Sequence, residues 1–374
     1  MNFSDATDFD DLPEDCRSAI ERALVLPPAN EVEREQALQE AARCLRLALD
    51  EDRARAGLWL FLGEVELLLG DAAQAEAAYR GAVEADPQEV LGYSGLAHSC
   101  AAQGRAAEAE DWIEQGLRIE PTAMLYGQLG QLFLEDGRME EAEGALRTGL
   151  ALDPDDPELL FLLARFFSRD EAEAERLLVR AIEIEPDHFL AWSELGALRL
   201  DLAQLDDARQ CFLKLVELAP ELSDGYRELA EVELHRDPER ALELVEEALE
   251  RDRDDVGAWS VMGRALIQLE RFEEAERKLL VACAIEPLEL EGAQVHDILA
   301  TLYMLLGRVE DAIATWHEVE HFAANEPSIA AGLGQAYAEL GRVREARDWL
   351  QVALEHDLDD DDSRTLLRML EDEQ

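Results

Sequence analysis

The sequence predicts an all-α protein, an α-α superhelix in which short helix pairs stack in tandem. Three periodic features predict this fold. Prolines recur about every 32 to 34 residues, at positions 87, 121, 154, 186, 220 and 287, with Arg253 in the one missing place. Each proline follows an apolar, amphipathic stretch, where it ends one helix before the next begins. The other two features are columns of small residues at fixed places within this period.

The first column is alanine without exception, at positions 75, 109, 142, 174, 208, 241, 275, 312 and 346. The second column holds only glycine or alanine, at positions 63, 97, 130, 164, 196, 230, 263, 300 and 334. Small side chains at these places let two helices cross at close approach. A glycine inside a helix costs about 1 kcal/mol relative to alanine, so its recurrence indicates tight packing.

Larger residues complete the pattern around these columns. In the first full unit they are Trp59, Leu62, Gly63, Gly70, Ala75, Tyr79, Ala82 and Pro87, and the same offsets return at Trp192, Leu195, Gly196, Ala208, Phe212 and Pro220. This order of aromatic, Leu-Gly, aromatic, alanine and proline residues resembles the tetratricopeptide repeat family. The resemblance implies a right-handed superhelix whose concave groove is lined by the first helix of each pair. It does not extend to the family's Lys and Asn carboxylate clamp, because the corresponding offsets lack both residue types.

The pattern divides the chain into four parts. Residues 1–11 are expected to be a disordered acidic N-terminus, and residues 12–55 a degenerate helical pair. Nine tandem repeats are expected over 56–358, starting near 56, 90, 123, 157, 189, 223, 256, 293 and 327. Residues 359–374 are expected to form a capping helix and an acidic tail. The inter-helix turn of repeat 4 is shortened at 167–170, and extra residues within 288–292 indicate a change of curvature. We expect one continuous solenoid.

Composition excludes several classes of function. The 374 residues contain 86 Asp and Glu against 34 Lys and Arg, a formal charge of −52. Such a surface repels phosphate backbones and anionic lipid, so we expect no nucleic-acid or membrane partner. Hydrophobic residues make up 48% of the chain, enough to bury a core, and five Cys are too few for a disulfide scaffold. A cytoplasmic location is expected because no signal-peptide pattern is present. The excess charge fits either a solubilising shell or an acidic trap for a basic partner.

The resemblance also identifies the residues expected to face the groove, which are those at offsets 2, 5, 9 and 12 of the first helix of each repeat. Guanidinium groups suit carboxylate or phosphate ligands, so Arg165, Arg227 and Arg264 are candidate anchors. The alternative is that these arginines pair with Glu158, Glu231 and Asp224. Apolar candidates for holding a peptide or an amphipathic helix are Leu60, Leu67, Phe161, Leu190, Leu200 and Ile267. The alternative for these is core packing between repeats.

Residues 317–321 read His-Glu-Val-Glu-His and match the H-E-x-x-H pattern. On one helix this pattern places two imidazoles on the same face beside a Glu that can activate zinc-bound water. The segment falls in the second helix of repeat 8, where Trp316 and Val319 fill packing positions and both histidines face outward. No strand or third ligand accompanies it. His317 and His321 are therefore only weak metal candidates, and no cofactor is expected.

These features predict a non-enzymatic scaffold or adaptor that binds a peptide segment or a folded partner in its concave groove. The alternative is a chaperone, or a secretion or assembly pilot, for a basic or aggregation-prone client. A remote alternative is a zinc-dependent peptidase using His317, Glu318 and His321. The sequence leaves the partner and the oligomeric state open.

Overall fold

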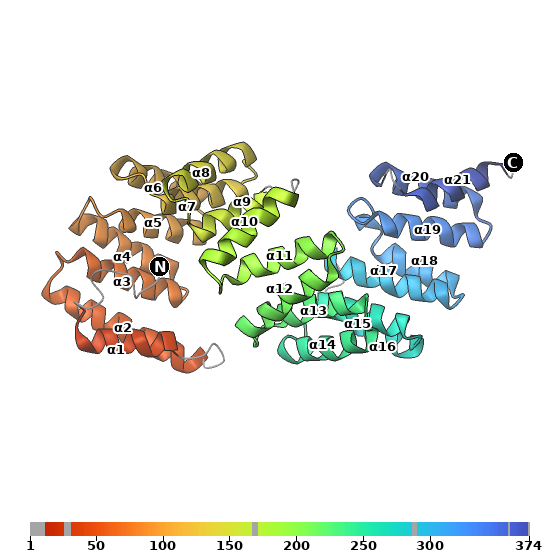
Figure 1. Ribbon diagram of the computed structural model, residues 1–374, viewed down its shortest axis with the longest axis horizontal. Coiled ribbons are helices and arrows are strands. Elements are labelled where there is room, and N and C mark those ends of the chain that lie inside the picture. Colours follow the sequence, from red (N-terminus) through yellow and green to blue (C-terminus); the bar gives the residue numbers. More distant parts are fainter. Residues whose placement is uncertain (1–11, 26–30, 167–170, 286–289, 358–359, 373–374) are drawn as a thin grey trace. The chain divides into compact units, whose positions relative to one another are not determined.

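All regular structure is helical in the part of the chain that the structure describes (Figure 1). The computed structural model describes residues 12–25, 31–166, 171–285, 290–357 and 360–372. The acidic segment 1–11, the shortened turn at 167–170 and parts of 288–292 and 359–374 lie outside these ranges. None of the described helices is long and apolar enough to cross a membrane.

The helices fall into two compact units, residues 1–186 and 187–374. The N-terminal unit contains α1 (Glu14–Val25), α2 (Glu31–Glu51), α3 (Ala56–Leu68), α4 (Ala72–Ala85), α5 (Val90–Ala102), α6 (Ala106–Ile119), α7 (Ala123–Glu135), α8 (Met139–Leu152), α9 (Pro157–Phe166) and α10 (Glu171–Ile184). Helices α1 and α2 pack against each other within the segment 12–55. Helices α3, α5, α7 and α9 begin at the residues where the sequence places the starts of repeats 1 to 4.

The C-terminal unit contains α11 (Phe189–Asp201), α12 (Leu205–Leu218), α13 (Ser223–Leu234), α14 (Pro238–Arg251), α15 (Val256–Gln268), α16 (Phe272–Cys283), α17 (Leu290–Leu305), α18 (Val309–Glu318), the 3₁₀ turn η3 (Glu320–Phe322), α19 (Pro327–Glu339), α20 (Val343–His356) and α21 (Asp361–Asp372). Helix α17 begins three residues before the predicted position 293. Helix α21 packs on α19 and α20, which covers the end of the stack.

Within each unit the first helices of neighbouring repeats contact one another, as α3 does with α5 and α13 with α15. A second helix instead contacts its own partner and the first helix of the next repeat. The first helices therefore line the inner side of each unit, and each helix touches only near neighbours in the sequence.

Close crossing within each pair depends on the two columns of small residues. All nine column alanines are buried. At the glycine column, a large side chain from the second helix of the pair fills the space beside each glycine of the first helix. A methyl group built on Gly196 would lie 2.5 Å from Cε1 of Phe212, and Tyr79, Leu146, Leu279 and Leu350 occupy the same place against Gly63, Gly130, Gly263 and Gly334. The predicted close approach is confirmed.

We predict that Gly196→Ala lowers the free energy of unfolding by about 1–3 kcal/mol, because the new methyl group overlaps a fully buried Phe212 ring. Gly144→Ala is the matched control, since a Cβ on this exposed helical glycine meets nothing within 4 Å. The control should gain up to about 1 kcal/mol from helix propensity. Urea unfolding followed by circular dichroism measures both, and a stabilising Gly196→Ala would contradict the packing argument.

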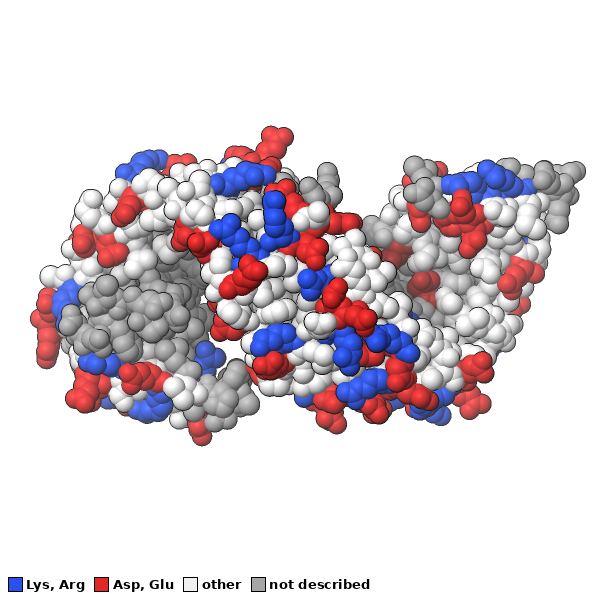
Figure 2. Space-filling view, viewed as in Figure 1, with Lys and Arg blue, Asp and Glu red and all other residues white. Residues whose placement is uncertain are grey.

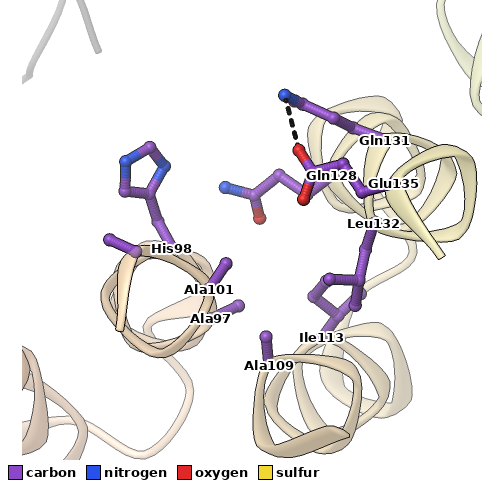
Figure 3. A pocket seen from close by; sticks show the side chains of 10 residues that line it. Ala97, His98, Ala101, Ala109, Ile113, Gln128, Gln131, Leu132 and Glu135 are labelled. Carbon is purple, nitrogen blue, oxygen red and sulfur yellow. Dashed lines mark hydrogen bonds between the residues drawn. The ribbon is translucent and has the colours of Figure 1, made fainter. Parts of the chain in front are cut away.

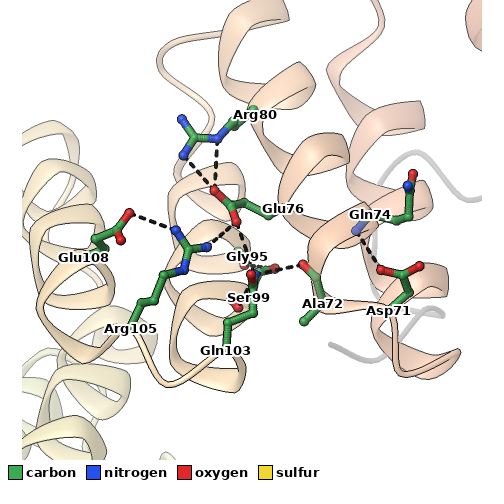
Figure 4. A network of polar contacts seen from close by, with 10 residues as sticks. All are labelled: Asp71, Ala72, Gln74, Glu76, Arg80, Gly95, Ser99, Gln103, Arg105 and Glu108. Atoms are coloured by element: carbon green, nitrogen blue, oxygen red, sulfur yellow. Dashed lines mark hydrogen bonds and ion pairs between the residues drawn. The ribbon is translucent and has the colours of Figure 1, made fainter.

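Arginines at the turns join neighbouring repeats. Arg105, which precedes α6, is paired with Glu76 of α4 and with Glu108 of its own helix (Figure 4). Glu76 also accepts hydrogen bonds from Arg80 and Gln103. The same bridge recurs where Arg138 meets Glu110 and Arg308 meets Glu276, at 2.8 and 2.7 Å. Acidic and basic side chains accordingly lie interspersed on the face in Figure 2.

The bridge at Glu76 makes stability depend on pH. Burial alone would raise the pKa of Glu76, but hydrogen bonds from Arg80, Gln103 and Arg105 outweigh it and hold the pKa below its usual value of 4.5. The folded state therefore favours the carboxylate. Its contribution to stability is complete above pH 4.5 and is lost as the pH falls through the lower, folded pKa.

We predict that Glu76→Gln lowers the free energy of unfolding by about 1.5–3 kcal/mol at pH 7, because charge-assisted hydrogen bonds are lost. The difference from wild type should shrink toward zero as the pH falls from 4.5 to 3. Urea unfolding at pH 7, 4.5 and 3 measures it, with Glu84→Gln on the exposed side of α4 as the control. A difference that is constant with pH would be inconsistent with the ionic bridge.

Candidate functional site: the inner surface of the first helices

The apolar groove candidates differ widely in exposure. Leu190 on α11 is 49% exposed. Leu60, Leu67, Leu200 and Ile267 are half-buried and pack against the core between repeats. Phe161 is only 3% exposed and offers no surface to a partner. The reason is that residues 159–164 of α9 are six consecutive apolar residues, which cover every side of the helix, and all six are buried.

The predicted arginine anchors are divided between the two units. Arg165 is exposed at the C-terminal end of α9 in the N-terminal unit. Arg227 on α13 and Arg264 on α15 lie together in the C-terminal unit, where they line a hollow of about 180 Å³ with Glu228, Glu231 and Ser260.

Both arginines of that hollow are paired with carboxylates, as the alternative interpretation proposed. Arg264 donates from Nη1 and Nη2 to the two oxygens of Glu231, at 2.9 and 2.8 Å. Arg227 reaches Asp224 at 2.9 Å, and Nη1 lies 3.3 Å from the carboxylate of Asp255, which also caps α15 through the backbone of Ala258. An incoming anion would have to displace these partners. The two arginines therefore join repeats 6 and 7.

The charged groups in this hollow shift one another's pKa values. Burial raises the pKa of Glu228, although Arg227 beside it acts in the opposite direction. Burial also acts to lower the pKa of Arg227, but Asp255 and its other acidic neighbours outweigh it and raise that pKa. Both shifts describe a compact ionic network between α13 and α15 rather than a free anion-binding site.

The His-Glu-Val-Glu-His string does not form the helical geometry that zinc sites of this pattern require. Both histidines are exposed and Trp316 and Val319 are buried, as predicted. The prediction that one helix carries both histidines is wrong, because α18 ends at Glu318 and a 3₁₀ turn begins at Glu320. His317 contacts Glu320 through Nδ1, and its Nε2 lies 2.7 Å from the Tyr337 hydroxyl of the next repeat. His321 instead packs on the ring of Phe322, with ring centroids 4.2 Å apart.

We predict that His317→Ala lowers the free energy of unfolding by about 0.5–1.5 kcal/mol through loss of the Tyr337 hydrogen bond. His321→Ala, which removes only a ring contact on the 3₁₀ turn, is the control. Adding zinc should shift the melting temperature of wild type and of both variants by the same amount. Stoichiometric zinc in the purified protein that disappears in His317→Ala would instead support the peptidase alternative.

A hollow of about 270 Å³ lies between α5, α6 and α7 in the N-terminal unit (Figure 3). Ala97, Ala101, Ala109, Ile113 and Leu132 form its apolar part, and His98, Gln128, Gln131 and Glu135 its polar part. Gln131 donates to Glu135 at 3.4 Å. Oε1 of Gln128 is buried and accepts no hydrogen bond from the residues that the structure describes.

A much larger groove, of about 1250 Å³, lies on the inner side of repeats 8 and 9 beneath the capping helix. We call it the C-terminal groove. Its walls come from α17, α19 and α21 and from the ends of α18 and α20. They include Asp297, Thr301, Met304, Ser328, Ala331, Gln335 and Ala338, the positions at which the repeat pattern places groove-facing residues.

The sequence pattern missed five further lining residues of this groove, four of them acidic. Glu339, Asp357, Asp360, Asp362 and Met369 lie at the end of α19, after α20 and on α21. All five fall outside the periodic offsets: Glu339 is the last residue of α19, and the other four belong to the region of the capping helix, which has no counterpart in the repeats. The acidic run at 359–362 was the one available signal.

The comparisons with known proteins agree with this architecture. Tetratricopeptide repeat models match residues 30–123 and 299–363 through one model, and 123–166, 190–222 and 234–282 through three others. The chain belongs to the tetratricopeptide repeat family. Proteins of this fold typically bind other proteins and typically are not enzymes.

Similar proteins are known in bacteria and mammals. The chain is 28% identical over 123 residues to the RNA polymerase II-associated protein 3 of Rattus norvegicus, covering 32% of this chain and 19% of that protein. It is 23% identical over 339 residues to the cellulose synthase operon protein C of Pseudomonas fluorescens (strain SBW25), covering 73% and 26%. The chain thus spans about a fifth to a quarter of the length of these relatives.

A solved structure also shares the fold. The tetratricopeptide repeat protein from Parabacteroides merdae superposes with a TM-score of 0.55 at 16% identity, over 66% of this chain and 98% of that one. At this identity the likeness supports the arrangement of helices and carries no information on a partner.

Proposed function

We propose that the protein is a non-enzymatic scaffold that holds a segment or a surface of a partner protein on the inner faces of its first helices. The observation that carries this proposal is the C-terminal groove, because residues at the groove-facing offsets of repeats 8 and 9 line a single space of about 1250 Å³. This exceeds the roughly 300–1,000 Å³ of small-molecule sites, so a polypeptide is the fitting occupant.

Exposed inner-face residues elsewhere are the further contacts that we propose. Arg165 in the N-terminal unit and Leu190 in the C-terminal unit are both exposed. Leu60, Leu67, Leu200 and Ile267 would contribute their exposed edges. Arg227 and Arg264 would hold the shape of the inner face through their ion pairs, and Phe161 would support it from the core.

A pilot or chaperone for a basic client is the second candidate, favoured by the carboxylates that line the C-terminal groove. Neither proposal needs chemistry by the protein's own side chains.

A cytoplasmic location stays a proposal supported by composition, which cell fractionation tests.

The scaffold proposal is tested with a matched pair of substitutions in repeat 5. Leu190→Glu changes an inner-face residue of α11 that is 49% exposed. The control, Leu213→Glu, changes a residue of the second helix α12 that is 41% exposed and lies away from the inner face. We expect the inner-face change to weaken affinity for a partner captured from host extract at least about tenfold, since a buried unpaired charge costs more than 1.4 kcal/mol.

The outer-face variant should bind as wild type does. Affinity is measured by calorimetry on the identified partner, after circular dichroism shows both variants folded. Arg165→Ala and Ala331→Trp extend the test to the N-terminal unit and the C-terminal groove. Equal affinity for every inner-face variant would remove the inner surface as the binding site.

A further inference from the structure

The C-terminal groove has an unusually one-sided charge. Its described lining residues include the five carboxylates of Asp297, Glu339, Asp357, Asp360 and Asp362, and no Lys or Arg is among them. Acidic groups that face one hollow with low-dielectric walls concentrate negative potential there, which attracts cationic groups.

The same groove contains uncovered apolar side chains. Leu305 at the end of α17 is 62% exposed, and Met369 on α21 is 59% exposed. Met304, Ala331 and Leu366 also line the space. Methionine is flexible and adapts to different apolar partners. The lining thus combines an apolar surface with carboxylates around it, which suits a segment that is itself apolar on one side and basic on the other.

Asp297 adds a second electrostatic observation. It accepts a hydrogen bond from Nε1 of Trp316 at 2.6 Å and lines the groove between repeats 8 and 9. Burial raises the pKa of this carboxyl, and the hydrogen bonds it accepts from Trp316 and Ser328 only partly oppose that effect. A cation bound beside Asp297 would stabilise its charged form.

The acidic segment 1–11 and a second copy of this chain are both poorly suited to occupy the groove. The first eleven residues carry four Asp and no Lys or Arg, so the groove repels them. A second copy of the chain brings 86 acidic residues against 34 basic ones and is repelled overall as well. Charge complementarity therefore favours a different polypeptide with an excess of Lys or Arg.

We propose that the C-terminal groove binds a cationic amphipathic segment of a partner protein, with its Lys or Arg residues on the groove carboxylates and its apolar side chains on Leu305, Met369 and Leu366. This inference rests on the proposed scaffold function and specifies the partner's chemistry. A helix of a few turns presents these two faces at the 3.6-residue period.

The test uses the full chain and two synthetic 18-residue helical peptides. One has Leu on one face and Lys on the other, and its twin has Glu in place of every Lys. Fluorescence anisotropy at 50 mM salt should show binding of the Lys peptide and at least about tenfold weaker binding of the Glu peptide. Raising the salt to 300 mM should weaken the Lys peptide several-fold, because exposed charges are screened.

Matched variants then locate the site. Glu339→Gln with Asp362→Asn removes two exposed groove charges, and Asp348→Asn with Glu355→Gln removes two exposed charges of α20 that do not line the groove. The groove pair should weaken the Lys peptide by about five- to tenfold and the control pair by less than about twofold. Leu305→Ser with Met369→Ser should weaken it by a similar factor without a change in salt dependence.

Three results would overturn the inference: equal affinity for the two peptides, equal loss in the groove and control pairs, or no effect of either groove pair. The capture experiment on Leu190 and Leu213 separates this inference from the scaffold function. A host partner that depends on the inner face, together with no binding of the Lys peptide, overturns only the groove chemistry. Groove-dependent peptide binding without any inner-face dependence of the host partner overturns only the scaffold function.

Discussion

The close crossing of two helices at small residues is the constraint on which the rest of the molecule depends. Where a helix carries glycine, as at Gly63 and Gly196, the opposing helix fills the space with Tyr79 or Phe212. The crossing fixes the angle within a pair, and the angle decides which residues of the first helix reach the next repeat. The inner surface, its hollows and the paired arginines all follow from that repeated geometry.

The distribution of charge follows from the same repetition. Turn arginines such as Arg105 and Arg138 lie near acids of the preceding repeat, and inner arginines such as Arg264 pair with acids of a neighbouring first helix. Some arginines thereby join repeats, and others pair with acids three or four residues away, as Arg118 and Arg271 do. Acids outnumber basic residues by more than two to one, so the surplus remains on surfaces and in the C-terminal groove. Surface pairs contribute little each, but their regular placement helps to fix the spacing of the repeats.

Much of the fold was predictable from the sequence because it depends on local, periodic signals. The Ala75 column and the Gly63 column identify helix pairs without knowledge of the tertiary structure. The contacts of the inner surface were harder to predict, because a residue's position in the repeat predicts the direction of its side chain and not the residues that the side chain contacts. Arg264 points inward as expected, but Glu231, 33 residues away, meets it. Phe161 is buried because it lies within six consecutive apolar residues of α9, all of which are buried.

Other features depended on contacts between repeats. The end of α18 at Glu318 accompanies the contact of His317 with Tyr337, and no propensity at 317–321 predicts a break. The acidic lining of the C-terminal groove brings together Asp297 and residues of α21 that are more than sixty positions away. Only the packing of the last helix makes them neighbours.

The nearest-neighbour arrangement of the helices also has a kinetic consequence. Because nearly all tertiary contacts join adjacent elements, the contact order is low and loop closure costs little entropy at each step. A helix pair near the N-terminus can form all its tertiary contacts once the next repeat has been synthesised and has left the ribosome. Folding can therefore keep pace with translation, which shortens the time for which apolar helix faces are open to aggregation.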